Sequence, residues 1–266
     1  MQNKTLIITI ISATVIAVIA VALIRLATKD GSVNNDEPIV IVLPNNNETE
    51  KQPESVSARA TTSQPSQPET AEKAKSLNFK INHVHQSNSE QSFRPLNQGD
   101  VLQSKDSYKI IFTPEEDSHV YIFQKDSANQ IFQLFPMERF KNIQLNNTNP
   151  VQSGQTYYLP SKSQSFKLDN QIGAETIYFL ATQQPDTALE KQYQQIQVAQ
   201  RNGDADQLEQ AQTQLMEILQ QKRPINLKDD SEKLTWTNKG QQSTVLQQRL
   251  DNLCQECVHI LTFQHQ

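Results

Sequence analysis

Glycine and early aromatic residues are scarce in this sequence. Six glycines among 266 residues leave no glycine-rich loop of the kind that cradles phosphates. No Phe, Tyr or Trp precedes Phe79, so the earlier residues lack the large side chains that dominate hydrophobic cores. We therefore expect the globular part of the chain to begin near Phe79.

Motifs typical of enzymes are also missing. Neither the G-x-S-x-G pattern of serine hydrolases nor the H-E-x-x-H pattern of zinc peptidases occurs in the chain. The formal net charge of −5 and the isoelectric point near 5.6, without a basic stripe, argue against a nucleic-acid partner. The sequence therefore predicts a protein that is not an enzyme, holds no cofactor or metal and binds no nucleic acid.

One long apolar run lies near the N-terminus. Residues 6–24 carry no charge, and at about 1.5 Å per residue a helix of that length crosses the roughly 30 Å hydrocarbon layer. A cleaved signal peptide is the alternative, since residues 20–22 resemble a cleavage site, but the run exceeds the usual apolar region of such peptides. We expect residues 1–29 to form a cytoplasmic tail and a single-pass anchor in the bacterial inner membrane, with a periplasmic C-terminal domain.

Residues 30–76 are rich in Pro, Ser, Thr, Gln, Asn and Glu. They contain eight acidic and four basic residues, so their local charge of −4 is most of the net charge of the chain. A segment of this composition cannot bury enough apolar surface to offset its chain entropy. We expect a disordered linker that leads to one folded domain, residues 77–266.

Short runs of Ile, Val, Phe, Tyr and Leu follow the linker, each closed by Pro, Asn, Asp or Gly. No helical pattern intervenes before residue 186, and such spacing indicates an antiparallel sheet or sandwich. Residues 120–124 and 130–135 form the clearest pair of strands, with Asp126 suited to the turn and Asn129 tolerant of a positive φ. Because their apolar residues are contiguous, we expect this hairpin to be covered on both faces.

The same region resembles a known family. Residues 93–185 contain, in order, a strand ending in Phe-x-Pro, a Val-Tyr-Ile-Phe strand, an Asp turn, Leu-Phe-Pro, Asn-Pro before a Gly turn, Leu-Pro and a Gly-x-Glu that opens the last strand. This succession is similar to the bacterial domain-of-unknown-function family four-three-eight-four, which often has Gly where this chain has Asn129. The resemblance implies an extracytoplasmic or membrane-linked β module of sensor-like or accessory type, with no established activity and no catalytic residues to transfer.

The apolar period becomes helical after residue 186. Apolar residues recur at spacings of three and four on both sides of an Arg-Asn-Gly-Asp break, which predicts helices over residues 187–201 and 204–222. Asp204 and Gln207 resemble an N-terminal capping pair for the second helix. The narrow apolar stripes fit packing against the sheet, and they also fit a helix pair reserved for another protein.

Mixed structure returns over residues 223–266. We predict a short strand at 234–237, a helix at about 242–252 and a strand at 258–263. An independent unit of this size would be marginal, so the last strand is expected to close the earlier sheet and to make the helical hairpin, residues 187–222, an excursion from one domain. The predicted class is α+β, a mainly antiparallel sheet or sandwich with an inserted helical hairpin.

Cys254 and Cys257 are the only cysteines, and their C-x-x-C spacing allows three interpretations. An exported domain can hold them as a local disulfide, which closes a very small loop. A metal site would need His259 as a third ligand, because an extended strand places His265 roughly 20 Å from it. A thioredoxin-type redox centre would need a strand-to-helix turn in a βαβ unit, which is missing here. We favour the disulfide.

His83 and His85 are two residues apart and share one face of a predicted strand. They could form a metal pair, but no third ligand is visible, and two polar side chains on a solvent-facing surface are the plainer interpretation.

Two function classes remain. The first is a membrane-tethered, non-catalytic binding or assembly module of the bacterial cell envelope, which contacts the membrane through residues 6–24 and engages another envelope protein. The second is an envelope thiol-redox or metal-binding protein that acts through Cys254 and Cys257.

Overall fold

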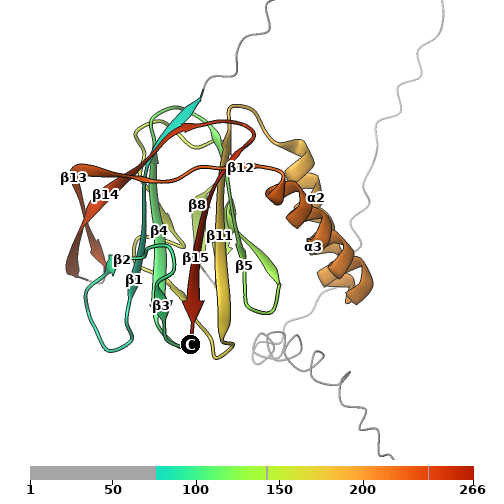
Figure 1. Ribbon diagram of the computed structural model, residues 1–266, viewed down its shortest axis with the longest axis horizontal. Coiled ribbons are helices and arrows are strands. Elements are labelled where there is room, and N and C mark those ends of the chain that lie inside the picture. Colours follow the sequence, from blue (N-terminus) through green and yellow to red (C-terminus); the bar gives the residue numbers. More distant parts are fainter. Residues whose placement is uncertain (1–75, 142, 239) are drawn as a thin grey trace, which may run out of the picture. The chain divides into compact units, whose positions relative to one another are not determined.

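The structure, a computed structural model, describes residues 76–141, 143–238 and 240–266. The anchor predicted at residues 6–24 lies outside these ranges, as does the predicted linker except for its last residue, Ser76. No helix within the described residues is both long and apolar enough to cross a bilayer. Two large sheets, a separate two-stranded hairpin and two helices make up the described part, which confirms the α+β class (Figure 1).

The first sheet, called sheet A, has seven strands and is antiparallel throughout. Its path runs β10-β4-β1-β14-β13, with β2 beside β1 and β9 beside β4. The longest register joins β1 to β4, from Phe79 opposite Pro114 to Gln86 opposite Ser107. The strands are β1 (Leu77–Gln86), β2 (Arg94–Pro95), β4 (Ser107–Pro114), β9 (Tyr157–Leu159), β10 (Phe166–Lys167), β13 (Lys228–Asn238) and β14 (Gln241–Leu253).

The second sheet, called sheet B, follows the order β12-β15-β11-β5-β6, with β3 beside β15. β11 pairs antiparallel with both β15 and β5, whereas the short β12 and β3 run parallel to β15. The last strand of the chain thus closes the earlier sheet, as the sequence predicts. The strands are β3 (Val101–Leu102), β5 (His119–Lys125), β6 (Ile131–Phe135), β11 (Gly173–Thr182), β12 (Arg223–Pro224) and β15 (Cys257–His265), and a separate hairpin pairs β7 (Met137–Phe140) with β8 (Ile143–Asn147).

An aromatic core joins the two sheets. Phe79 of β1 and Phe112 of β4 both meet Phe179 of β11 edge to face, with ring centroids 5.2 and 5.6 Å apart, and all three are buried. Edge-to-face pairs of this kind stabilise a core by about 0.5–1.5 kcal/mol beyond the burial of their area. The inward residues of both sheets therefore form one continuous cluster.

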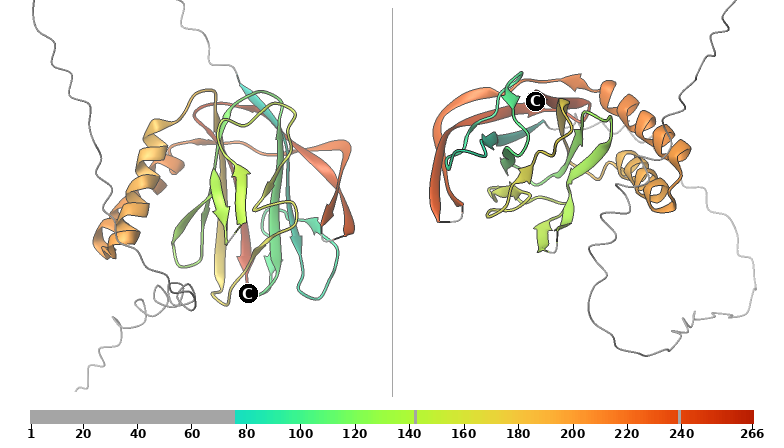
Figure 2. Two further views of the ribbon diagram at one scale, coloured as in Figure 1. Left: turned by 180° about the vertical axis from the view of Figure 1, so that it is seen from behind. Right: turned by 90° about the horizontal axis from the view of Figure 1, so that it is seen from below.

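The helices α2 (Thr187–Asn202) and α3 (Ala205–Gln220) lie side by side (Figures 1 and 2). Each begins at an aspartate whose carboxylate accepts a backbone N–H three residues on, Asp186 from Leu189 and Asp204 from Gln207. Gly203, in the left-handed region at a φ of 67°, ends α2 and turns the chain back.

This helical hairpin packs on the outer face of sheet B. Along β5, Val120 and Ile122 point into the sandwich, while the alternating Tyr121 and Phe123 point toward the helices. The β5–β6 hairpin is thus covered on both faces, as its contiguous apolar residues predict, and the helical stripes serve packing against the sheet. The buried residues at this interface are Tyr121, Phe123, Ile131, Tyr178, Leu180, Leu189, Ile196, Ala211, Leu215, Leu219 and Val258.

The helix predicted at about residues 242–252 is wrong, because this segment is strand β14. Its Gln, Leu and Arg residues suit a helix, yet pairing with β13 on one side and β1 on the other decides the conformation. Val245 packs with Trp236 of β13 and Leu250 enters the main core. The β13–β14 pair projects from the side opposite the helices (Figure 2).

Candidate ligand-binding site

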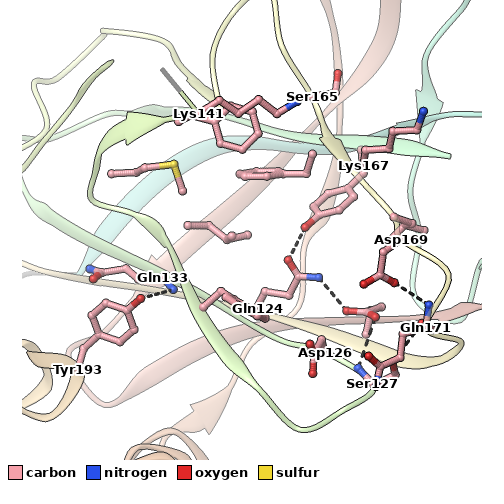
Figure 3. Close-up of a pocket in the computed structure, with 18 residues that line it drawn as sticks. Gln124, Asp126, Ser127, Gln133, Lys141, Ser165, Lys167, Asp169, Gln171 and Tyr193 are labelled. Carbon is pink, nitrogen blue, oxygen red and sulfur yellow. Dashed lines mark hydrogen bonds between the residues drawn. The ribbon is translucent and has the colours of Figure 1, made fainter. Parts of the chain in front are cut away.

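A cavity of about 430 Å³ opens between the turn of the β5–β6 hairpin, the β7–β8 hairpin and the segment around β10. This volume lies within the range of about 300–1,000 Å³ that is typical of small-molecule sites. Its walls combine apolar and charged side chains (Figure 3). They are Tyr108, Gln124, Asp126, Ser127, Phe132, Gln133, Leu134, Met137, Phe140, Lys141, Ser165, Phe166, Lys167, Leu168, Asp169, Gln171, Glu175 and Tyr193.

The turn between β5 and β6 forms an acidic end of the cavity. Asp126 accepts hydrogen bonds from the backbone N–H groups of Ala128 and Gln130, at 2.9 and 2.7 Å, and Asn129 takes the predicted positive φ. Because Gly173 has no side chain, the start of β11 can lie close to this turn: a Cβ at Gly173 would be only 2.6 Å from the Cβ of Ser127. Backbone geometry therefore fixes the position of the Asp126 carboxylate.

A chain of buried polar side chains connects the sandwich interior to this end. The Tyr108 hydroxyl donates to Gln124 Oε1, and Gln124 Nε2 donates to Glu175 Oε2 at 2.7 Å. Glu175 is only 4% exposed and also accepts the Ser127 N–H at 3.4 Å. Because three elements of the fold contribute to it, this network holds the Glu175 carboxylate in one place.

Burial and like charge act on the carboxylates of this end. Burial raises the pKa of Glu175 above its usual value, and the negative charges of Asp126 and Asp169 raise it further. The pKa of Asp126 is raised by burial in the same way, with Asp169 contributing. Asp169 itself is exposed and accepts the Gln171 N–H at 2.7 Å. The acidic end therefore concentrates negative charge.

Apolar side chains line the middle of the cavity. Phe140 of β7 meets Phe166 of β10 nearly at a right angle, with ring centroids 5.5 Å apart. Met137 is partly buried and packs against the main core, and Phe132 at the mouth is 44% exposed. From α2, the Tyr193 hydroxyl accepts the Gln133 N–H at 3.1 Å, so the helical hairpin also contributes a wall.

Two lysines also line the cavity. Lys141 and Ser165 lie on the side away from Asp126, and Lys167 lies between Ser165 and Asp169 (Figure 3). A second, more polar hollow of about 670 Å³ shares the same three residues. Neither lysine forms an ion pair with any residue in the described ranges. The cavity thus carries opposite charges at its two ends.

The cysteine pair lies elsewhere, in the turn between β14 and β15. Cys254 and Cys257 are bonded as a disulfide with Cα atoms 4.9 Å apart. Arg223 of β12 places one guanidinium nitrogen 3.4 Å from each sulfur. His259, the third ligand considered for a metal, bonds through Nδ1 to the Ile225 carbonyl oxygen at 3.1 Å. Within residues 76–266, gaps aside, no three His, Cys, Asp or Glu side chains are grouped to hold a metal ion.

His83 is not on a solvent-facing surface, and this expectation is wrong. It shares a strand face with His85 as predicted, but that face of β1 points into the sandwich, and His83 is 1% exposed. Its ring lies 5.4 Å from that of His259. The alternation of Leu77, Phe79 and Ile81 on the same face could have predicted this burial.

Sequence reasoning missed the cavity, because its charged residues come from four separate places: the β5–β6 turn, the β7–β8 turn, the β10 segment and the start of β11. One signal was available. Gln124 and Glu175 are polar residues inside strands that are otherwise apolar, and buried polar groups of this kind are usually held for a reason.

The described residues form a β-rich sandwich with a helical hairpin packed on one of its sheets. Residues 101–185 match the family model described as Domain of unknown function (DUF4384), which confirms the resemblance predicted from the sequence. No curated protein and no solved structure matches the chain. The matched segment covers less than half of the chain and runs from β3 to the residues before α2. It includes every residue that lines the cavity except Tyr193.

Proposed function

We propose that the protein is a membrane-tethered, non-catalytic binding module of the bacterial cell envelope, whose β domain takes a small ligand into the cavity. The observation that carries this proposal is the cavity itself, with apolar walls and a few fixed polar groups, which is the usual composition of a ligand site. The tether rests on the uncharged run at residues 6–24. Through that anchor the module would act beside the inner membrane.

Native mass spectrometry of the full chain purified from envelope membranes tests the binding role. We expect the wild-type protein to carry a small molecule and the Ser165→Trp variant, which fills the cavity, to lose it. Ser163→Trp is the matched control, because Ser163 is exposed in the same loop and does not line the cavity. A wild-type protein without a bound molecule, or equal retention by Ser165→Trp, would contradict the proposal.

Cysteine labelling in intact cells tests the location. A charged maleimide that cannot cross the inner membrane should label Cys254 and Cys257 only after mild reduction, because the proposal places a disulfide outside the cytoplasm. If the cysteines are labelled only after cell lysis, and are not labelled in denatured spheroplasts, the domain lies in the cytoplasm. That result would overturn the tethered arrangement.

A second candidate function, thiol redox chemistry, is favoured by one observation. The Arg223 guanidinium lies 3.4 Å from both sulfurs, and a neighbouring cation stabilises a thiolate. If redox chemistry were the function, a folded Cys254→Ser/Cys257→Ser variant would reproduce the phenotype of a deletion. We expect the double variant to retain function and Ser165→Trp to lose it.

A further inference from the structure

The cavity separates two kinds of charge along an apolar wall. Asp126 lies toward one end and Lys141 toward the other, with Asp169 and Lys167 along the side between them. Glu175 belongs to the acidic end, because it accepts the Ser127 N–H of the same turn. The charges of the two ends are not neutralised by ion pairs within the described residues, apart from a contact of 3.9 Å between Glu175 and His265. A ligand can therefore meet both charges directly.

The acidic end suits an organic cation better than a metal ion. In the part of the chain that the structure describes, these carboxylates are not grouped closely enough to hold a metal. Asp126 and Asp169 are instead each held by backbone N–H groups of turns. Carboxylates held in this way match an ammonium group, which can donate charge-assisted hydrogen bonds to more than one of them.

The basic end and the wall define the rest of the ligand. Lys141 places its Nζ 5.3 Å from the centre of the Phe140 ring, so its charge lies beside the apolar wall. Lys167 follows Phe166 in β10. Phe166 lies on the buried side of this strand and Lys167 on the exposed side. A chain that packs on Met137 and Phe140 would lead an anionic group toward Lys141.

We propose that the cavity binds a zwitterionic amphiphile, with an ammonium group at Asp126 and Asp169, an apolar chain along Phe140 and Phe166, and an anionic group at Lys141 and Lys167. This inference rests on the proposed binding function and names the chemical class of the ligand. A ligand of one charge satisfies one end and leaves the other unpaired.

Four eight-carbon probes test the assignment by calorimetric titration of the full chain in detergent: 8-aminooctanoate, octylamine, octanoate and octanol. The Ser165→Trp variant in the same detergent corrects for uptake by micelles. We expect 8-aminooctanoate to bind about tenfold more tightly than octylamine or octanoate, a difference of about 1.4 kcal/mol, because it pairs a charge with both ends of the cavity. Octanol should bind most weakly.

Charge-neutral variants locate the two ends. Asp169→Asn should reduce the affinity for 8-aminooctanoate but leave the affinity for octanoate unchanged. Lys167→Gln should also reduce the affinity for 8-aminooctanoate, but it should leave the affinity for octylamine unchanged. Asp117→Asn is the matched control, since Asp117 is also exposed and accepts a turn N–H, that of Ser153 at 2.7 Å, outside the cavity. It should change neither affinity.

The outcomes separate the two proposals. If a singly charged probe or octanol binds as tightly as 8-aminooctanoate and Ser165→Trp abolishes that binding, the zwitterion assignment is overturned while the cavity remains a binding site. If no probe binds and the purified protein also carries no molecule, the proposed function fails as well.

Discussion

Two sets of polar side chains lie inside the sandwich, and they differ in how completely they are hydrogen-bonded. Tyr108, Gln124 and Glu175 form a connected chain that ends at the cavity. His83 and His259 form a pair in which three of the four ring nitrogens have no hydrogen-bond partner among the described residues. Both sets are nearly inaccessible to solvent.

The two sets also respond differently to charge. Burial raises the pKa of Glu175, whereas the hydrogen bonds that it accepts from Gln124 and Ser127 act in the opposite direction and favour its charged form. Burial lowers the pKa of His83 well below its ordinary value, with the positive charge of His259 adding to the effect, and burial likewise lowers that of His259. Hydrogen bonds thus partly offset the cost of a buried charge in the connected set, whereas burial favours the neutral form of both histidines.

The largest effect is expected from breaking the connected set. Gln124→Leu removes the central member and leaves the Tyr108 hydroxyl and the Glu175 carboxylate without their partner. We expect the free energy of unfolding to fall by about 3 kcal/mol, since each unsatisfied buried group costs about 1–3 kcal/mol. Denaturation followed by the fluorescence of Trp236, the single tryptophan, measures it. Gln133→Leu, which loses one bond to the Phe135 carbonyl, should cost less than 1 kcal/mol by the same reasoning, and equal losses would refute the distinction.

Acid tests the histidine pair. In the unfolded chain both histidines take up a proton near pH 6.5, whereas in the folded chain they do so only at a lower pH. The stability that they contribute is therefore complete above pH 6.5 and is lost as the pH falls toward the lowered pKa values of the folded state. Each histidine can lower the free energy of unfolding by up to about 1.4 kcal/mol for each pH unit of acidification. The raised pKa of Glu175 acts in the opposite direction over part of this range.

A variant separates these contributions. His83→Leu removes a buried ring that has no hydrogen bond, so stability at pH 7 should be kept or increased and the loss between pH 6.5 and 5 should become smaller. An acid slope identical to that of the wild type would show that the pair does not govern the pH response.

The smallest effect is expected at His265, whose ring is hydrogen-bonded more completely than that of His83 but less completely than the side chain of Glu175. Its Nε2 bonds to Ser104 Oγ at 3.1 Å, and its Nδ1 has no hydrogen bond but lies 3.9 Å from Glu175 Oε1. Ser104→Ala should lower the free energy of unfolding by about 1 kcal/mol, the usual net value of one hydrogen bond. Thermal unfolding measures it, and no change would mean that the ring is held by packing alone.

Strong local patterns allowed much of the fold to be predicted. The contiguous apolar residues of β5 and β6 predicted a hairpin covered on both faces, and Asn129 predicted its turn. β14 was missed because its residues favour a helix. It becomes a strand only through pairing with β1, which is distant in the sequence, and with β13, which precedes it and folds back on it. The cavity was missed for a related reason: Asp126 and Glu175 become neighbours only when β5 and β11 pair.

The position of β15 has a consequence for the order of events in folding. This strand comes last in the sequence yet lies beside β11 in the interior of sheet B, with Phe179 opposite His259 and Gly173 opposite His265. Until it arrives, β11 offers an open row of backbone N–H and C=O groups beside exposed aromatic residues, which is a template for pairing with another chain. A protein cut short before Cys257 would therefore be prone to aggregate, and a tag attached after Gln266 would lie next to the strand on which completion of the sheet depends.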